Sequence, residues 1–582
     1  MRFSVLALLL FTPVAALAQT TVQGRVVSPA GESIIAATVM LTGGGATKTA
    51  STDSAGHFVF YDVARGAYRL RAQSIGYLPL QRDITIGENP LVADFELTEA
   101  PVSIDAVTVE GQRQRARFQN QAGVTTRELS KGELKLIPGL AESDVLRAIE
   151  ALPGVVSTSD FSSSYNVRGG SADQNLIMLD GIPIYNPFHL GGMFSIFNSD
   201  MVERAELLAG GFPAEYGGRV SSVLNVVSDI GHGGFNVEGG VSVLATRLAV
   251  AGELSASAAQ KLGITSARFR VGGRRSYFDQ LFKPVFDFPY HLTDLQLNAE
   301  VWKSQTSRFS LSGYAGTDVL RFAGVEDFPL LFNFTWGNNV VGAGWTKLLN
   351  NAGTVDVRTS FSHFDTFILF PEFGDTRFTS EIDHALIKGG VTLPVGKHQL
   401  KFGTELNRMW YDNLAQSGGT VFRRGNDVGW QPGMYAQMSL RPTPQWLIET
   451  GIREDLWHAR TTSKTFSELA PRLAVKRFFA DGDAAVKLAL GRYTQFVHSL
   501  RDEEFPIGID VWVLTGARAP VVVSDQIQTG IEWFPDVGWY AAVETYYRKF
   551  DNVTTNNFAD NPNDDFDDLL RGYGVSYGGD AV

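Results

Sequence analysis

The first residues to test for chemistry are a lone arginine, Arg168, and the two glycines after it, Gly169 and Gly170, in the stretch SYNVRGGSADQNLIMLDGIPI. A phosphate-binding loop needs a lysine and a serine or threonine at fixed spacing after its glycines, at the start of a helix. Here no lysine follows, and the glycines lead into an apolar, strand-like run that closes at Asp180 and Gly181. The pattern therefore argues against a phosphate site.

No catalytic or metal-binding pattern takes its place. This stretch lacks the G-x-S-x-G turn of a serine nucleophile, and the nine histidines of the chain are dispersed without an H-E-x-x-H motif. The chain has no cysteine, which excludes disulfides and thiolate ligands. The acidic run DNPNDDFDD at 560–568 lacks the central glycine and final glutamate of an EF-hand loop. We therefore expect no enzyme activity, no metal and no cofactor.

The charge balance and the first residues limit the class of protein. The net charge is −12 and the basic residues are scattered, so nucleic acid is not an expected partner. Arg2, the apolar run 5–10 and the Ala-Leu-Ala of 16–18 predict a signal peptide over 1–18, cut before Gln19. No run of 18 apolar residues follows it. The sequence thus indicates either a soluble exported protein or an outer-membrane β-barrel.

Residues 19–98 alternate apolar and polar positions between glycine-containing turns, which predicts a small β-sandwich. The order of its glycines, apolar residues and Thr-Asp turn resembles the carboxypeptidase-regulatory-like domain. That domain has a transthyretin-like fold and, despite its name, implies no peptidase chemistry. The resemblance rests on Gly24, Val26, Ala37, Val39, Leu41, Thr52, Asp53, Gly56, Phe58, Gly66, Tyr68 and Leu70.

Residues 99–119 are predicted to be a linker. It contains one strand-forming segment between polar stretches, made of Asp105, Ala106, Val107, Thr108 and Val109. Two interpretations are open. The segment is the last edge strand of the sandwich, or it is a detachable strand that pairs with the sheet edge of a partner protein.

Residues 120–229 mix helical and strand patterns and predict an α+β domain. In AESDVLRAIEALPG, Val145, Ile149 and Leu152 fall on one helical face, and the proline-glycine pair ends the helix. The segment NLIMLDGIPI predicts a β-hairpin that turns at Asp-Gly.

Residues 230–582 repeat strands with alternating apolar residues, joined by tight turns such as the Pro-Thr-Pro of 442–444. Short turns that alternate with long loops are typical of an outer-membrane β-barrel, whereas a soluble solenoid or propeller needs evenly short loops. Five polar stretches between the turns are the expected long loops: 318–336, 364–384, 410–430, 458–468 and 494–524.

Four motifs, taken in this order, resemble those of the TonB-dependent outer-membrane receptors. They are LPGV (152–155), NVRGG (166–170), LDGIP (179–183) and AEYGGR (214–219). The N-terminal sandwich resembles that of the SusC-like subgroup. The resemblance covers essentially the whole chain, and it implies that 120–229 is a plug domain folded inside the barrel.

The resemblance also implies an anchor for the plug. Plug arginines of the family meet barrel glutamates, which suggests Arg168 and Arg219 here. The other anchor residues are Gly169, Gly170, Asp180, Gly181 and Glu215, and the candidate barrel carboxylates are Glu405, Glu449 and Glu454. Beyond the hairpin, Tyr185, Asn186 and His189 either contact the solute at the plug apex or pack against the barrel wall.

The partners that the resemblance implies are a TonB-like periplasmic protein that pairs with residues 105–109 and supplies energy, outer-membrane lipid, an unidentified solute and a surface lipoprotein. The expected function is energised uptake of a scarce solute across the outer membrane. A passive porin, a surface-binding barrel or a transport-incompetent remnant are the alternatives, and a signal-transducing receptor normally carries a different N-terminal domain. The solute class stays open between glycans, siderophores, cobalamin and peptides.

The predicted fold is mainly β, with a transthyretin-like sandwich, an α+β plug and an incomplete transmembrane antiparallel β-barrel over 230–582. The hairpin pattern gives about 14–16 barrel strands, where the family has about 22. The chain stops in RGYGVSYGGDAV, as a new strand begins. Because an open barrel would leave bare strand edges in lipid, we expect a truncated product that lacks roughly 150–250 residues.

Overall fold

The computed structural model describes residues 20–556 and 575–577, with gaps. The gaps are 29–32, 35–36, 44–45, 54, 75–79, 98–114, 116–117, 124–125, 138–141, 158–163, 232–233, 284–287, 305, 326–327, 350–352, 463, 501–509, 517–518 and 537–538. The predicted signal peptide, the segment 105–109 and the acidic run 560–568 lie outside the described residues. The chain forms two compact units, one of 1–119 with 536–539 and one of the remainder.

No helix within the described ranges has the length and apolar character needed to cross a membrane.

The first unit contains the predicted sandwich. In one sheet β4-β1-β7 lie in order and β8 also pairs with β1, and the other sheet has the order β3-β2-β5-β6. Alternate residues of β1 are buried, among them Val22 and Val26, and they pack with Phe58 of the same sheet and with Leu41 and Leu70 of the other sheet. The strands are β1 (Thr20–Val27), β2 (Thr38–Gly43), β3 (Ala46–Ser51), β4 (His57–Val63), β5 (Gly66–Gln73), β6 (Leu80–Ile86), β7 (Leu91–Val92) and β8 (Phe95–Glu96).

In the second unit, residues of 126–228 form a five-stranded sheet of order β13-β12-β17-β16-β9. Its strands are β9 (Thr126–Ser130), β12 (Asn175–Leu179), β13 (Ile182–Pro183), β16 (Val202–Leu208) and β17 (Ser222–Ser228). The remaining elements are α2 (Lys131–Leu136), α3 (Val145–Glu150), β10 (Val155–Ser157), β11 (Tyr165–Val167), β14 (Phe188–His189), β15 (Phe194–Ser195) and the short 3₁₀ turns η1 (Ala172–Gln174) and η2 (Leu190–Gly192).

Both local predictions for this domain are confirmed. Helix α3 begins after Asp144, whose carboxylate accepts the backbone N–H groups of Leu146 and Arg147 as an N-cap. The hairpin β12–β13 turns at Asp180 (φ 53°) and Gly181 (φ 79°), the left-handed backbone that an Asp-Gly pair adopts in a two-residue turn. The Asp180 carboxylate also accepts from the backbone N–H and hydroxyl of Ser228, at 2.8 and 2.7 Å.

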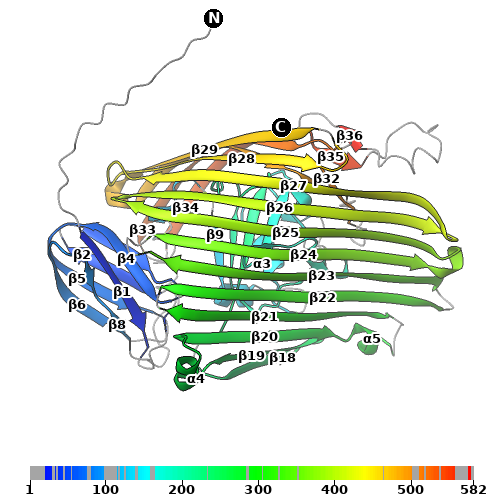
Figure 1. Ribbon diagram of the computed structural model, residues 1–582, viewed down its shortest axis with the longest axis horizontal. Coiled ribbons are helices and arrows are strands. Elements are labelled where there is room, and N and C mark those ends of the chain that lie inside the picture. Colours follow the sequence, from blue (N-terminus) through cyan, green and yellow to red (C-terminus); the bar gives the residue numbers. More distant parts are fainter. Residues whose placement is uncertain are drawn as a thin grey trace, which may run out of the picture. The chain divides into compact units, whose positions relative to one another are not determined.

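A 15-stranded antiparallel sheet forms the rest of the second unit (Figure 1), in sequence order from β18 to β34. Its strands are β18 (Asn236–Val241), β19 (Ala245–Glu253), β20 (Ser266–Ser276), β21 (Tyr290–Ser304), β22 (Ser307–Val325), β23 (Phe328–Leu348), β24 (Thr354–Phe370), β25 (Thr376–Val395), β26 (His398–Ser417), β27 (Thr420–Leu440), β28 (Trp446–Ala459), β29 (Thr465–Phe479), β30 (Ala484–Gln495), β33 (Val522–Asp536) and β34 (Trp539–Asp551).

Smaller elements lie between or after these strands. They are α4 (Ala256–Lys261), α5 (Phe278–Leu281), η3 (Pro371–Phe373), η4 (Ala480–Gly482), β31 (Val497–Ser499), β32 (Trp512–Leu514), β35 (Thr554–Asn556) and β36 (Val575–Tyr577).

The two faces of the large sheet have inverted polarity compared with a water-soluble protein. On β21, Leu295 and Leu297 are 55% and 37% exposed, whereas Asp294, Gln296 and Asn298 between and beside them are buried. Apolar residues therefore point outward and polar residues inward, as in a barrel wall whose outer face contacts lipid.

The wall contacts the five-stranded domain from one end of the sheet to the other. Side chains along the whole strand order bond to it: Arg247 of β19 to the Asp200 carboxylate, Arg358 of β24 to the carbonyl of Asp180, and Arg548 of β34 to the carbonyl of Val167. In Figure 1 the cyan elements of this domain lie behind the green and yellow strands.

The prediction of five long loops is wrong for most of them. The stretches 318–336, 364–384 and 410–430 belong almost entirely to β22–β27, which are 17 to 21 residues long and joined by short turns. At one end of these strands the outward face carries polar residues such as Glu381 and Asp412, whereas towards the other end the same face carries apolar residues. We infer that this part of the wall extends beyond the lipid, so the apolar alternation ends although the strand continues. Only 494–524 contains a long connection, with β31 and β32 inside it.

Candidate functional site

Arg168 binds the barrel wall through two strands. It follows β11 with a positive φ of 50°, and Gly169 continues the left-handed turn at 82°. Its Nη2 lies 2.7 Å from Oε2 of Glu544 on β34, and its Nη1 donates to Oε1 of Gln528 on β33 at 3.1 Å. The Arg168 side chain is 4% exposed, so this is a buried ion pair between the plug and the wall.

The carboxylate that binds Arg168 belongs to a chain of alternating charges on the inner wall. Glu544 also accepts from Lys487 Nζ, which lies 3.0 Å from Oε1 of Glu532, and Lys476 lies 2.5 Å from Oε2 of Glu532. Each carboxylate therefore lies between two cations. Arg168 is the plug's contribution to this series.

We predict that Arg168 and Glu544 are energetically coupled. Arg168→Gln should reduce the free energy of plug release by about 3 kcal/mol, because it leaves a partly buried carboxylate with one cation fewer. The double variant with Glu544→Gln should show a coupling energy of about 1–2 kcal/mol. Release can be followed in urea with a fluorescent label at Ala151→Cys, an exposed plug position in a chain without native cysteine. Strictly additive effects of the two substitutions would contradict the coupling.

The three candidate carboxylates have other neighbours. Glu405 binds Arg453 of the wall itself, Glu449 accepts the backbone N–H of Ala122 at 3.2 Å, and Glu454 accepts the hydroxyl of Ser467 at 2.6 Å. Arg219 forms no ion pair within the described part of the chain; its Nη1 donates to the carbonyl of Gly218 at 2.8 Å. The structure thus places Arg168, but not Arg219, against a barrel glutamate, and that glutamate is one the sequence did not indicate.

At Glu215 of the AEYGGR motif the charges are opposite to those of an arginine anchor, because the plug supplies the carboxylate and the wall supplies the cations. Its carboxylate pairs with Lys401 of β26, and its carbonyl accepts from Lys388 of β25 at 2.7 Å. Burial alone would raise the pKa of Glu215, but the two lysines outweigh burial and hold that pKa below its usual value. The plug therefore offers the wall a carboxylate here and a guanidinium at Arg168.

His189 lies between two carboxylates of the wall. Its Nδ1 is 2.6 Å from Oδ2 of Asp318 and its Nε2 is 3.0 Å from Oδ1 of Asp294. Tyr314 donates to Asp294 at 2.6 Å, and Tyr290 donates to Asp318. Burial lowers the pKa of His189, but the two carboxylates more than compensate and raise it to about 9, so the ring is an imidazolium at neutral pH.

The two neighbours of His189 in the prediction also touch the wall. Tyr185 shares a hydrogen bond with Nδ1 of His384 at 3.0 Å, and the carbonyl of Asn186 accepts from Asn338 at 2.8 Å. Tyr185 and His189 are almost fully buried. Their contacts match the alternative of packing against the wall, and a role in solute binding stays a prediction.

Barrel arginines hold the glycine-rich loop of the plug by its backbone. Arg548 donates to the carbonyls of Val167, Ala209 and Ser221 at 3.0, 3.3 and 3.1 Å. Arg472 donates to the carbonyl of Phe212 at 3.0 Å. Sequence reasoning missed these arginines, because each is a single inward residue on a strand and no local motif marks it.

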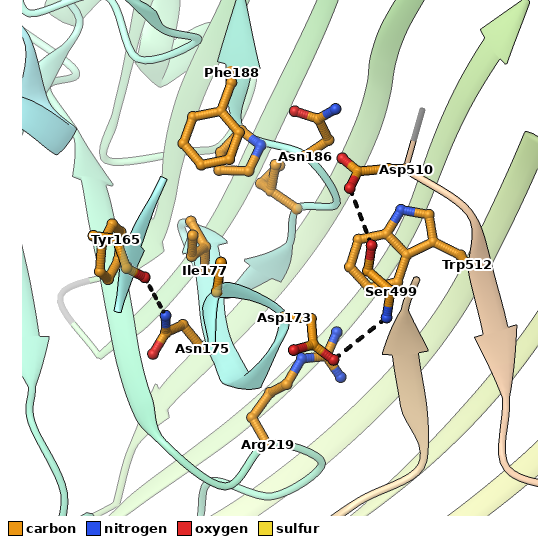
Figure 2. A pocket seen from close by; sticks show the side chains of 13 residues that line it. Tyr165, Asp173, Asn175, Ile177, Asn186, Phe188, Arg219, Ser499, Asp510 and Trp512 are labelled. Carbon is orange, nitrogen blue, oxygen red and sulfur yellow. Dashed lines mark hydrogen bonds between the residues drawn. The ribbon is translucent and has the colours of Figure 1, made fainter. Parts of the chain in front are cut away.

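Among the cavities between the plug and the wall, two are relevant to the site. The Trp512 cavity has a volume of about 60 Å³ and is drawn in Figure 2. The His384 cavity also has a volume of about 60 Å³. The Trp512 cavity is lined by plug residues and by three residues of the β30–β33 connection, Ser499, Asp510 and Trp512. Those three lie in the stretch 494–524, which the sequence indicated only as a long loop.

Within the described ranges, no group of three or more histidine, aspartate or glutamate side chains is arranged to hold a metal ion.

Comparison with known protein families assigns two domains of the chain. Residues 21–98 match the carboxypeptidase regulatory-like domain, and residues 124–222 match the TonB-dependent receptor plug domain. No curated relative matches the chain. The fold is similar to that of the siderophore receptor PirA from Pseudomonas aeruginosa, with 15% identity, 74% of this chain and 76% of that chain covered, and a TM-score of 0.57.

Two further solved structures have the same fold. One is a mutant of the ferric enterobactin receptor PfeA from Pseudomonas aeruginosa (14% identity, 76% and 73% covered, TM-score 0.57). The other is the alcaligin outer-membrane receptor FauA from Bordetella pertussis (12% identity, 75% and 72% covered, TM-score 0.55). The chain therefore combines a carboxypeptidase regulatory-like domain and a TonB-dependent receptor plug domain with a large antiparallel sheet, and it has the fold of these plugged receptor barrels.

Proposed function

We propose that this receptor takes up a scarce, bulky solute across the outer membrane, with energy supplied by a TonB-like periplasmic protein. The observation that carries the proposal is a plug domain bonded to the wall from β19 to β34. A passive pore has no need of such a domain, because its lumen must stay open. The outward apolar face supports a place in outer-membrane lipid.

The plug–wall contacts support gating by force. They are mostly separate polar bonds, such as Arg168–Glu544 and Glu215–Lys401, that can break one after another. Solute binding alone cannot drive uphill uptake, so energy has to enter through a mechanical link. We propose the segment 105–109 as that link, which pairs with the partner's sheet edge.

The test is a cross-link at one position of that segment. Val107→Cys should form a disulfide or short cross-link with a cysteine-substituted edge strand of the TonB-like periplasmic domain, and Val107→Pro should abolish pull-down by the same domain, because proline removes a backbone donor. Asp83→Cys, at an exposed position of the sandwich, is the matched control and should stay unlinked. Equal cross-linking at 83 and 107, or none at 107, would sink the proposed energy link and favour a passive barrel.

Two similarities bear on the class of solute that the protein takes up. The three similar structures are a siderophore receptor, a ferric enterobactin receptor and an alcaligin receptor, while the N-terminal sandwich resembles that of SusC-like transporters.

A further inference from the structure

Arg219 is a buried cation that forms no ion pair with any residue described in the structure. Its side chain is 8% exposed, and its Nε makes no hydrogen bond within the described part of the chain. Its guanidinium carbon lies 6.0 Å from the centre of the Tyr185 ring. The nearby wall carboxylate of Glu405 is already bound to Arg453. Arg168, the other arginine of the plug motifs, is in contrast paired with Glu544.

The position of Arg219 indicates which group could supply a counter-charge to its buried guanidinium. Arg219 is the one residue that lines both the Trp512 cavity and the His384 cavity. In Figure 2 its guanidinium lies on the side of the cavity where Asp173, Ser499 and Trp512 are found. A buried guanidinium without a counter-charge is unfavourable unless another group supplies the charge. At the junction of two cavities, a bound solute is able to do so.

Other unpaired donors line the same cavity. The Nε1 of Trp512 and the hydroxyl of Tyr165 are both buried and have no hydrogen-bond partner among the described atoms. Trp512 and Tyr165 are 5% and 1% exposed. Buried donors are nearly always paired in proteins, so three unpaired donors around one cavity indicate a ligand rich in acceptors.

We propose that Arg219 is an oxyanion subsite, which binds a carboxylate or phosphate group of the solute between the two cavities. The planar fork of a guanidinium suits both groups, because each offers two oxygens for paired hydrogen bonds. The inference deepens the proposed function, on which it rests, by giving the solute at least one negative group.

The acidic residues of the Trp512 cavity restrict where that group binds. Asp173 accepts from Gln495 at 3.1 Å and from the backbone N–H of Ser499 at 3.3 Å, and Asp510 accepts from the Ser499 hydroxyl at 3.0 Å. These two carboxylates disfavour an anion beside them in the Trp512 cavity. The oxyanion is therefore placed on the side of Arg219 that faces the His384 cavity, and a neutral or cationic part of the solute lies beside Asp173 and Asp510.

The test uses the full chain in detergent, in buffer free of other oxyanions. Acetate, inorganic phosphate and the neutral amide acetamide are titrated while Tm is followed by intrinsic tryptophan fluorescence. We expect a saturable rise of about 2–4 °C with at least one of the two anions and none with acetamide, because binding to the folded state alone stabilises it. A rise with acetate only identifies a carboxylate, and one with phosphate only identifies a phosphate.

Arg219→Gln should abolish the anion-dependent rise without lowering Tm in anion-free buffer. Arg219→Lys keeps the charge but loses the planar fork, and it should reduce the anion-dependent rise in Tm severalfold. This variant tests the subsite if Arg219→Gln fails to fold. The matched control is Arg408→Gln, an outward arginine that lies 5.0 and 5.2 Å from the rings of Trp410 and Trp430 and should respond as the unaltered chain does. An equal rise in Arg219→Gln, or no rise in the unaltered chain, overturns the subsite. Because binding in detergent needs no energised partner, either result is independent of the cross-link at Val107.

Discussion

Replacing His189 with asparagine should reduce the free energy of plug release by roughly 3 kcal/mol and remove most of its dependence on pH above neutrality. The imidazolium of His189 is bound by Asp318 on one nitrogen and Asp294 on the other. Burial lowers the pKa of His189 and the two carboxylates raise it, with a net value of about 9. Asparagine leaves two buried carboxylates facing a neutral side chain.

The sign of the pH effect follows from that shift. A free histidine has a pKa near 6.5, so the seated plug binds a proton more tightly than the released plug. The stabilisation is complete below about pH 6.5 and is lost as the pH rises through about 9. Urea titrations of the chain labelled at position 151, carried out at pH 6, 8 and 10, should therefore show progressively easier release.

His458→Asn is the matched control, because His458 is an exposed residue of β28 far from any plug contact described above. It should keep the pH dependence of the unaltered chain. If the His189 variant retains the same loss of stability between pH 6 and pH 10, then other groups titrate in that range and the ion cluster around His189 is not its source.

Local features of the fold were predictable from short stretches of sequence. The hairpin at Asp180-Gly181 and the helix capped by Asp144 depend on residues within a few positions of each other. The alternation along 295–301 likewise indicated an outward apolar face. In each case the physical cause, a left-handed turn, a capped helix end or a lipid-facing strand, acts within a single element.

The partners of the plug residues were not predictable in this way. Glu544 is separated from Arg168 by 376 positions, and nothing near it in the sequence distinguishes it from Glu405, Glu449 or Glu454. Glu454 even lies at an alternate position from the buried Arg453 and Asp455, on the outward face. Which carboxylate points into the lumen depends on strand register, and register is set by the whole sheet.

The long strands β22–β27 show a second limit. Apolar and polar residues alternate along a strand only where its two faces meet different surroundings, so a strand can continue where the alternation stops. Where both faces of the wall meet water, polar residues occupy both, and the pattern becomes that of a loop although the hydrogen-bond ladder continues. A sequence-based boundary in this region marks a change in what the outer face of the strand meets and not the end of the strand.

The other large effect is expected for Arg548→Met. Arg548 holds three plug carbonyls, those of Val167, Ala209 and Ser221, and has no carboxylate partner among the described residues. Methionine fills a similar volume but removes the guanidinium donor from the carbonyls of Ala209 and Ser221, whereas the carbonyl of Val167 keeps the backbone N–H of Gly170 and the hydroxyl of Ser221. We expect the free energy of plug release to fall by about 3 kcal/mol, because buried carbonyls without a donor are costly. Arg477→Met is the matched control, since Arg477 lies over the rings of Trp446 and Phe479 and touches no plug residue described above.

A substitution on the plug side tests the same contact independently. Gly210 has a positive φ of 98°, and a Cβ there would lie 2.5 Å from Nη2 of Arg548 and 2.2 Å from Nε2 of Gln528. Gly210→Ala should therefore push the loop off Arg548 and, like Arg548→Met, raise the ion conductance of the chain in planar bilayers. Both changes disturb the Arg548 contact, so combining them should weaken plug seating by less than the sum of the two effects, although Gly210→Ala also displaces Gln528, which accepts from Arg168. Full additivity, or unchanged conductance in both variants, would mean that Arg548 does not hold this loop in place.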